Sequence, residues 1–311
     1  MRPTMNRRST LLSITSLLSF VVLWSCSPYE QDSYQQEYVV EAYLVEGQIF
    51  PTVTLTTSGE LFEPFTLRDR RVDGATVIIE SSDAGQLMTY QQIDSSGIYA
   101  PTDTTQKIEA TATYQLTIDV PDKDSPIRAT TTVPEPLTVL GGITDRVVYQ
   151  SSEQLEILVS GSPAGQQRFF IFNTISQDPK EEDLTPFYKA TLEDSDGDVL
   201  LEDFYKVSSG ILNEANFFDE NGNTVLRLPW LAVSFYGRNA IVANVLDKNS
   251  YDFVRSQSVQ LGGSTLSPGE IQNVINHVEG AVGIFGSISS DTIYTTIDRN
   301  PLLEFTPLDP R

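Results

Sequence analysis

Asp194, Asp196 and Asp198 alternate along one short polar segment of the 311-residue chain. Carboxylates at alternate positions of a loop are oxygen ligands of the kind that Ca²⁺ prefers. An EF-hand loop would continue with Gly at its sixth position and Glu at its twelfth, where this chain has Val199 and Tyr205. The three aspartates are therefore a weak Ca²⁺ candidate. We expect a solvated hairpin turn at this place, and no other metal or cofactor.

The chain offers little for catalysis. His277 is its only histidine. The sequence contains no Gly-x-Ser-x-Gly elbow, no Walker-type phosphate loop and no dinucleotide-binding Gly-x-Gly-x-x-Gly motif. Because covalent catalysis needs a nucleophile beside a base, we expect no catalytic residues and a non-enzymatic role. A carboxylate pair among the 42 Asp and Glu residues would suffice for a glycosidase, although no spacing selects one.

Charge and composition narrow the class further. The chain has 42 acidic residues against 20 Lys and Arg, a net charge of −22, and 40% of its residues are hydrophobic. This apolar share is enough for a globular core, whereas the acidic balance would repel the phosphates of a nucleic acid. A single cysteine excludes an intramolecular disulfide framework. We therefore expect a globular protein that does not bind nucleic acid.

The N-terminus has the features of an export signal. Arg2, Arg7 and Arg8 precede an apolar stretch at 11–24. That stretch is shorter than the ~20 residues needed to cross a bilayer, and no later stretch is longer. A basic head followed by a short apolar region is typical of a secretory signal peptide, which we place at 1–25.

The end of this signal indicates a lipid anchor. Residues 23–26, Leu-Trp-Ser-Cys, resemble a bacterial lipobox, in which the cysteine is lipidated and becomes the first residue of the mature protein. We therefore predict lipidation at Cys26, followed by a flexible polar tether at 26–37. Several acyl chains would hold the folded part on a membrane.

Short strands follow the tether. Seven runs rich in β-branched and aromatic residues lie at 38–47, 52–57, 75–81, 87–92, 98–100, 113–120 and 127–133. Turn signals separate them, as in a β-sandwich of the immunoglobulin or fibronectin type. Tyr114, Leu116, Ile118 and Val120 alternate along the sixth run, which places them on one face. A Pro-Glu-Pro sequence ends the series, so we expect a sandwich domain at 38–136.

A second β-rich domain with one or two short helices is expected at 137–311. Its strand candidates are 155–159, 168–173, 187–192, 199–205, 224–228, 231–236, 240–246, 282–287 and 292–297. Asp-Gly at 196–197 and Asn-Gly at 221–222 favour tight hairpins. A helix is predicted at 250–260 with Asn249 as its N-cap. The predicted fold class is thus mainly β, with an immunoglobulin/fibronectin-like sandwich preceding this domain.

Two features of the second domain could serve binding. Ten acids and two lysines lie between positions 178 and 203, which would suit a basic partner or a cation. Aromatic residues are frequent between 169 and 236, and exposed rings could bind a glycan. We favour the simpler interpretations, a solvated acidic face and a mainly buried set of rings.

The order of several segments resembles one known family. These segments are Tyr-Val-Val-Glu-Ala-Tyr-Leu-Val-Glu-Gly at 38–47, Val-Asp-Gly-Ala-Thr-Val at 72–77, Gly-Ile-Tyr at 97–99, Tyr-Gln-Leu-Thr-Ile at 114–118, Ala-Thr-Thr-Thr-Val-Pro at 129–134 and Val-Glu-Gly-Ala-Val-Gly-Ile-Phe-Gly at 278–286. After an acylated cysteine, this order resembles the Bacteroidota outer-membrane lipoprotein family catalogued as domain of unknown function 4249. The resemblance implies an outer-membrane lipoprotein, often associated with TonB-dependent receptors, and supplies no catalytic residues.

The functional expectation combines these points. We expect a non-catalytic lipoprotein of the cell outer membrane, on its periplasmic or cell-surface side, that acts as an accessory or binding component of a TonB-dependent transporter. Two alternatives stay open. One is a surface or periplasmic hydrolase that acts on glycan or peptide, and the other is a transmembrane β-barrel, which also shows alternating strands after a signal.

Overall fold

The computed structural model describes residues 34–302, except 61–63, 65, 95, 122, 153–154, 163–166, 196, 218–221 and 261–272. The chain divides into two compact units, Met1–Gln36 and Glu37–Arg311. Cys26 and Asp196 lie outside the described residues, as does the predicted signal peptide. The second unit is mainly β, which confirms the predicted fold class.

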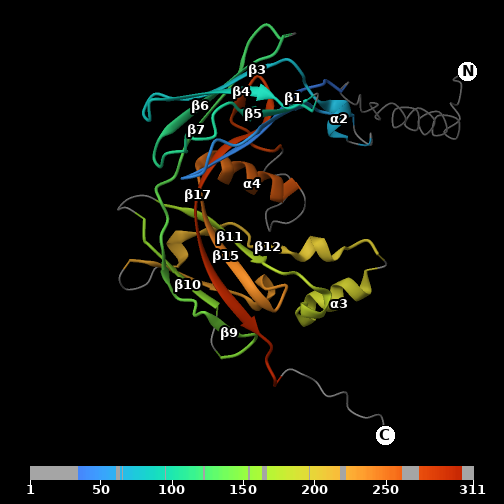
Figure 1. Ribbon diagram of the computed structural model, residues 1–311, viewed down its shortest axis with the longest axis vertical. Coiled ribbons are helices and arrows are strands. Elements are labelled where there is room, and N and C mark those ends of the chain that lie inside the picture. The colour runs from blue at the N-terminus through green and yellow to red at the C-terminus, as the bar shows by residue number, and fades with distance from the viewer. Residues whose placement is uncertain are drawn as a thin grey trace, which may run out of the picture. The chain divides into compact units, whose positions relative to one another are not determined.

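Seven strands at the start of this unit form an immunoglobulin-type sandwich (Figure 1). They are β1 (Tyr38–Val45), β2 (Val53–Thr57), β3 (Thr76–Ser81), β4 (Gln86–Gln92), β5 (Ile98–Pro101), β6 (Thr113–Asp119) and β7 (Ile127–Thr132), with the short helix α2 (Leu67–Arg70) between β2 and β3. One layer has the order β1-β2-β5-β4 and the other β4-β3-β6-β7, all antiparallel, so that β4 belongs to both. This is the A-B-E-D and C-F-G arrangement of immunoglobulin domains, and all seven predicted strands are confirmed.

The core of the sandwich follows from the alternation of its strands. Tyr114, Leu116, Ile118 and Val120 are all buried between the layers, as the sequence predicts. The Tyr114 hydroxyl accepts a hydrogen bond from the backbone N–H of Glu109 at 2.9 Å. A bond between the hydroxyl of a tyrosine in the sixth strand and the backbone of the preceding corner is typical of immunoglobulin-type domains.

One long strand connects this core to the rest of the unit (Figure 1). β17 (Val282–Asp298) replaces the two strands predicted at 282–287 and 292–297. It pairs in parallel with β1 and then antiparallel with β15 (Gly237–Leu246). The prediction of two strands was wrong because the polar run at 289–291 breaks the apolar pattern, whereas β15 continues to supply backbone partners there.

A second core lies beyond residue 136. The additional strands are β8 (Val139–Gly141), β9 (Arg146–Val148), β10 (Leu155–Val159), β11 (Phe169–Ser176), β12 (Lys206–Ser208), β13 (Leu212–Asn213), β14 (Thr224–Leu228) and β16 (Val278–Glu279). A three-stranded sheet of order β14-β10-β8 packs against β11, β15 and β17, and Leu226, Ile157 and Phe172 are buried between them. The two cores separate between Val133 and Leu137, although Phe285 of β17 lies in the first. The predicted domain boundary near 136 stays a prediction.

Three predicted strands of the second domain are wrong. Residues 187–192 lie in the helix α3 (Pro186–Asp194), residues 199–205 contain the 3₁₀ helix η2 (Leu201–Phe204), and 231–236 begins within the 3₁₀ helix η4 (Trp230–Ala232). A threonine followed by proline at the first helical position starts α3, which is a helix signal that outweighs the aromatic content. The hairpin predicted at 196–197 includes Asp196, which lies outside the described residues, whereas the described segments on either side of it, α3 and η2, are helical.

The predicted helix at 250–260 exists as α4 (Lys248–Gln260), but its N-cap differs. Asp247 accepts a hydrogen bond from the backbone N–H of Ser250 at 2.8 Å, so Asp247 is the N-cap. Asn249 lies in the first turn, where it is buried and donates to the carbonyl oxygens of Thr130 and Phe285 at 2.7 and 2.9 Å.

Candidate functional site

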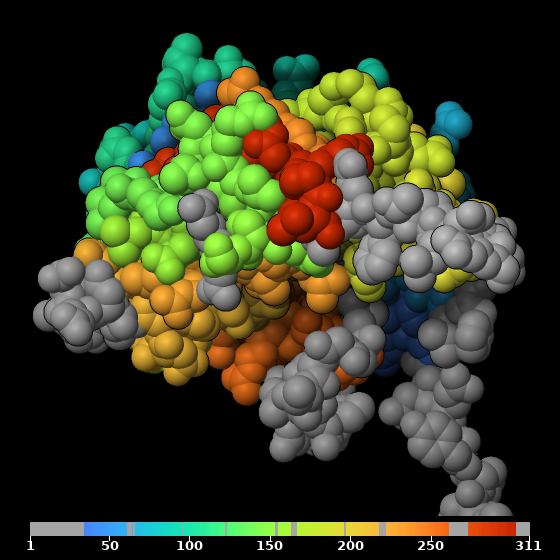
Figure 2. Space-filling view, turned by 90° about the horizontal axis from the view of Figure 1, so that it is seen from below, coloured from blue at the N-terminus to red at the C-terminus, as the bar shows by residue number. Residues whose placement is uncertain are grey.

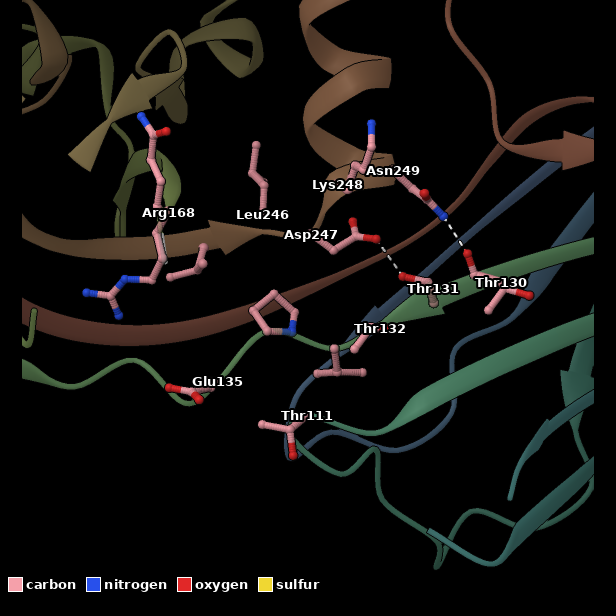
Figure 3. Close-up of a pocket in the computed structure, with 14 residues that line it drawn as sticks. Thr111, Thr130, Thr131, Thr132, Glu135, Arg168, Leu246, Asp247, Lys248 and Asn249 are labelled. Atoms are coloured by element: carbon pink, nitrogen blue, oxygen red, sulfur yellow. Dashed lines mark hydrogen bonds between the residues drawn. The ribbon is translucent and has the colours of Figure 1, made fainter. Parts of the chain in front are cut away.

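A polar cleft lies where the two cores meet (Figure 3). Its volume is about 530 Å³, and its walls come from β7 and the residues that follow it, the two residues before β11, the end of β15 and the start of α4. Thr130, Thr132 and Lys248 are exposed along it, while Thr131 and Asp247 are buried beneath. The volume falls within the range of small-ligand sites, and most of the residues that line the cleft are polar, although apolar atoms supply about as much of its surface as polar atoms do.

Asp247 is the central acceptor beneath the cleft. Its carboxylate accepts hydrogen bonds from the Thr131 hydroxyl at 2.6 Å and from the backbone N–H groups of Ser250 and Ser287 at 2.8 and 3.1 Å. Figure 3 shows the bond to Thr131 beside the bond from Asn249 to Thr130. The donors belong to β7, α4 and β17, so one carboxylate connects three elements. Hydrogen bonds to a carboxylate are among the stronger ones, so Asp247 has a structural role at this junction.

Replacing Asp247 by Ala is expected to lower the free energy of unfolding by roughly 2–4 kcal/mol, because a helix cap is lost and buried donors are left without an acceptor. Urea unfolding would measure the change. Asp124→Ala is the matched control, because that carboxylate is exposed and should change the free energy by about 0.5 kcal/mol or less. Equal effects of the two substitutions would contradict a structural role for Asp247.

A buried ion pair lies beside the cleft. Arg168 Nη2 is 2.7 Å from Glu214 Oε1, and the Glu214 side chain is fully buried. Glu214 also accepts hydrogen bonds from the backbone N–H of Ser162 at 3.1 Å and from the Thr224 hydroxyl at 2.9 Å. Burial alone would raise the pKa of Glu214, but these bonds and the charge of Arg168 outweigh it and hold that pKa below its usual value of 4.5. In Figure 3 the Arg168 side chain lies away from Asp247.

His277 is also in a pair. Its Nε2 lies 2.8 Å from Asp252 Oδ2 of α4, and Lys248 donates to the same carboxylate. Burial alone would raise the pKa of Asp252, but the hydrogen bonds and charges of these two partners outweigh it and lower the pKa. The contact between His277 and Asp252 connects the segment before β16 to α4.

The calcium candidate is only partly visible. Asp194 is the last residue of α3 and Asp198 follows it, and both are exposed. Asp196 lies outside the described residues, so this candidate stays a prediction. Among the residues that are described, no three His, Cys, Asp or Glu side chains come together in a way that could hold a metal ion. In the same part of the chain, no helix combines the length and apolarity needed to cross a membrane.

Sequence reasoning missed the buried polar residues at this junction. Asp247 could have been found, because an aspartate directly before a helical pattern is a common N-cap. The pair of Arg168 and Glu214 gave no signal, since the two residues are 46 positions apart.

Fold and site together define a mainly β protein, in which an immunoglobulin-type sandwich and a second β core meet at a polar cleft. The model of one protein family, described as a domain of unknown function (DUF4249), matches residues 27–293. The chain therefore belongs to the DUF4249 family, as the resemblance implied. No curated protein matches this sequence significantly.

Two solved structures show remote similarity. The native conformation of the alpha-2-macroglobulin of E. coli is 10% identical with a TM-score of 0.25, over 86% of this chain and 14% of that one. Immunoglobulin domains 1–5 of Sidekick-1 are 11% identical with a TM-score of 0.20, over 87% of this chain and 41% of that one. This chain thus spans less than half the length of either protein.

Proposed function

We propose that this chain is a non-catalytic, lipid-anchored protein of the outer membrane that acts as an accessory component of a TonB-dependent transporter. The observation that carries the proposal is the lipobox-like tetrad at 23–26, which directly precedes the residues matched by the family model. A chain anchored by acyl groups at its N-terminus influences transport by binding another protein.

The geometry of the folded unit supports a binding role. The buried carboxylates of Asp247 and Glu214 both accept several hydrogen bonds, so these two acids stabilise the scaffold on which the loops are presented. An immunoglobulin-type sandwich presents its loops on a rigid scaffold, and such loops commonly carry binding sites, although the fold by itself does not define the partner.

Lipidation at Cys26 is the first testable consequence. Mass spectrometry of the purified protein should find a diacylglyceryl group on an N-terminal Cys26, since the tetrad at 23–26 resembles a lipobox. A Cys26→Ala chain behind an ordinary signal peptide should move to the soluble fraction. A free thiol at Cys26, or a mature chain that begins elsewhere, would refute this step.

Affinity purification of the tagged full chain from detergent-solubilised outer membranes tests the partner. A TonB-dependent barrel should co-elute in roughly stoichiometric amount. Recovery of the chain alone would contradict the accessory role. Turnover of a glycan or peptide, lost when acids are changed to amides, would favour the hydrolase instead.

A further inference from the structure

The segment between β11 and β12 forms a small lobe with a core of its own. We call it the α3 lobe, and it comprises the 3₁₀ helix η1 (Glu181–Asp183), α3 and η2, packed on η4. Leu184, Phe204 and Phe235 are buried at its centre, and Tyr188 packs against them. The α3 lobe therefore has a packed core that supports the side chains on its surface.

An apolar patch lies on the surface of the α3 lobe. Phe187 and Leu231 are 52% and 54% exposed, and both adjoin Tyr188. The Phe187 and Tyr188 rings meet edge to face with centroids 5.1 Å apart, and the Tyr188 hydroxyl donates to the carbonyl oxygen of Leu231 at 2.8 Å. A single exposed apolar side chain is ordinary, but adjoining ones that include aromatic rings are typical of the centre of a protein interface. We call these three residues the Phe187 patch.

A hollow lies on another side of α3. It has a volume of about 300 Å³, and Pro186, Ala190, Tyr236 and Arg299 contribute to its walls. The Arg299 guanidinium lies 4.4 Å from the centre of the Tyr236 ring. Figure 2 shows the red end of β17 lying between the yellow-green surface of the lobe and the green surface that includes β9. The hollow could receive a side chain of a partner that contacts α3.

The charge around the lobe selects the kind of partner. Its cations are paired, since Lys180 contacts Asp178, Lys189 lies 4.0 Å from a helical glutamate, and Arg299 binds Asp183. Five exposed carboxylates make no ion pair with any described residue, and they are Glu181, Glu182, Asp194, Asp198 and Glu202. A surface with this excess attracts a basic partner and repels anionic lipid headgroups.

We propose that the α3 lobe is the docking surface for a partner protein that presents aromatic or aliphatic anchors flanked by Lys and Arg. The anchors would cover the Phe187 patch and enter the hollow on the other side of α3, while the basic residues would face the carboxylates that make no ion pair with a described residue. Apolar groups at the centre and charges at the rim are the usual division of an interface. The inference rests on the proposed function, because it locates on this molecule the contact that an accessory protein needs.

A peptide titration tests the chemistry directly. The full chain in detergent is titrated with a synthetic peptide in which Trp and Leu are flanked by Arg and Lys, and with a matched peptide that carries Glu at the basic positions. The basic peptide should bind and should weaken as salt increases. The double variant Phe187→Ser, Leu231→Ser should bind it at least tenfold more weakly, because the patch is lost.

The matched control is Leu87→Ser, since Leu87 is 57% exposed on β4 of the sandwich. It should bind the basic peptide as the wild type does, and circular dichroism should show all variants folded. If the double variant binds the basic peptide as tightly as the wild type does, the binding is only the general attraction of an acidic protein for a basic peptide. That result would overturn the proposal. Failure of the wild type to bind the basic peptide would overturn it as well.

The same variants separate this inference from the proposed function during affinity purification from outer membranes. If the wild type and Leu87→Ser retain a TonB-dependent barrel and the double variant loses it, both proposals stand. If all three retain it, the α3 lobe is not the docking surface and the accessory role stands. If the wild type retains no barrel, the accessory role fails, and the peptide titration alone decides whether the α3 lobe binds a basic partner.

Discussion

Replacing Glu214 by Gln is expected to lower the free energy of unfolding by about 3–5 kcal/mol at neutral pH, as is typical when one partner of a buried ion pair is removed. Arg168 is itself buried and would keep its charge without a carboxylate to balance it. Urea unfolding monitored by tryptophan fluorescence would measure the change. The value is large because both side chains are buried, so that solvent screens the unpaired guanidinium only weakly.

The chain contains a matched control for this prediction. Arg227 and Glu156 form an ion pair at 3.1 Å with side chains that are 69% and 38% exposed. Glu156→Gln should cost less than about 1 kcal/mol, because solvent screens an exposed pair. If both substitutions cost the same, the pair of Arg168 and Glu214 is not buried as described.

The Glu214 carboxylate should also make the free energy of unfolding depend on pH. Because the pKa of Glu214 is lower in the folded chain than its usual value of 4.5, ionised Glu214 stabilises the fold above that pH. This contribution is lost as the pH falls below 4.5 and through the folded pKa. The difference in unfolding free energy between wild type and Glu214→Gln should therefore shrink in acid. A constant difference from pH 7 to pH 3 would contradict the lowered pKa.

Gly283→Ala is expected to destabilise the chain by more than about 4 kcal/mol, at the severe end of single substitutions. Gly283 pairs with Val40 where β17 runs parallel to β1, and its φ of +117° lies in a region that favours glycine. A methyl group here would overlap the carbonyl oxygen of Val40 and lie 2.9 Å from its nitrogen. The measurements are the yield of folded protein and its urea unfolding.

Gly47→Ala is the control that measures the cost of backbone strain without the steric overlap expected at Gly283. Gly47 has a φ of +72°, but an added methyl group there would meet nothing within 4 Å. Its cost should therefore be only that of a left-handed residue, roughly 1–2 kcal/mol. If Gly283→Ala is no more harmful than Gly47→Ala, the close approach of β17 to β1 is wrong.

The first sandwich could be predicted from the sequence because its information is local. Alternation over 113–120 assigned Tyr114, Leu116 and Ile118 to one face, and all three are buried. Turn residues separated this strand from its neighbours in the same way. Such alternation expresses the two-residue period of a strand, which every short segment carries within itself.

The second domain shows where local information misleads. The apolar and aromatic run at 187–192 favoured a strand, yet it is helical and covers the small core that contains Phe204 and Phe235. The Thr-Pro pair before it was the better signal, because proline at the first helical position needs no N–H donor there. Local propensity is a weak guide where the packing of a whole lobe decides.

The sequence by itself determined the β character, the strands of the first sandwich and the family to which the chain belongs. Only the tertiary structure decided that β17 continues through both cores and that Asp247 accepts a hydrogen bond from Thr131, which is 116 positions away. It also decided that Glu214 is buried against Arg168. Contacts of this kind form between residues that are far apart in the sequence. They depend on the packing of the whole chain, and the residues adjacent to each partner in the sequence do not indicate them.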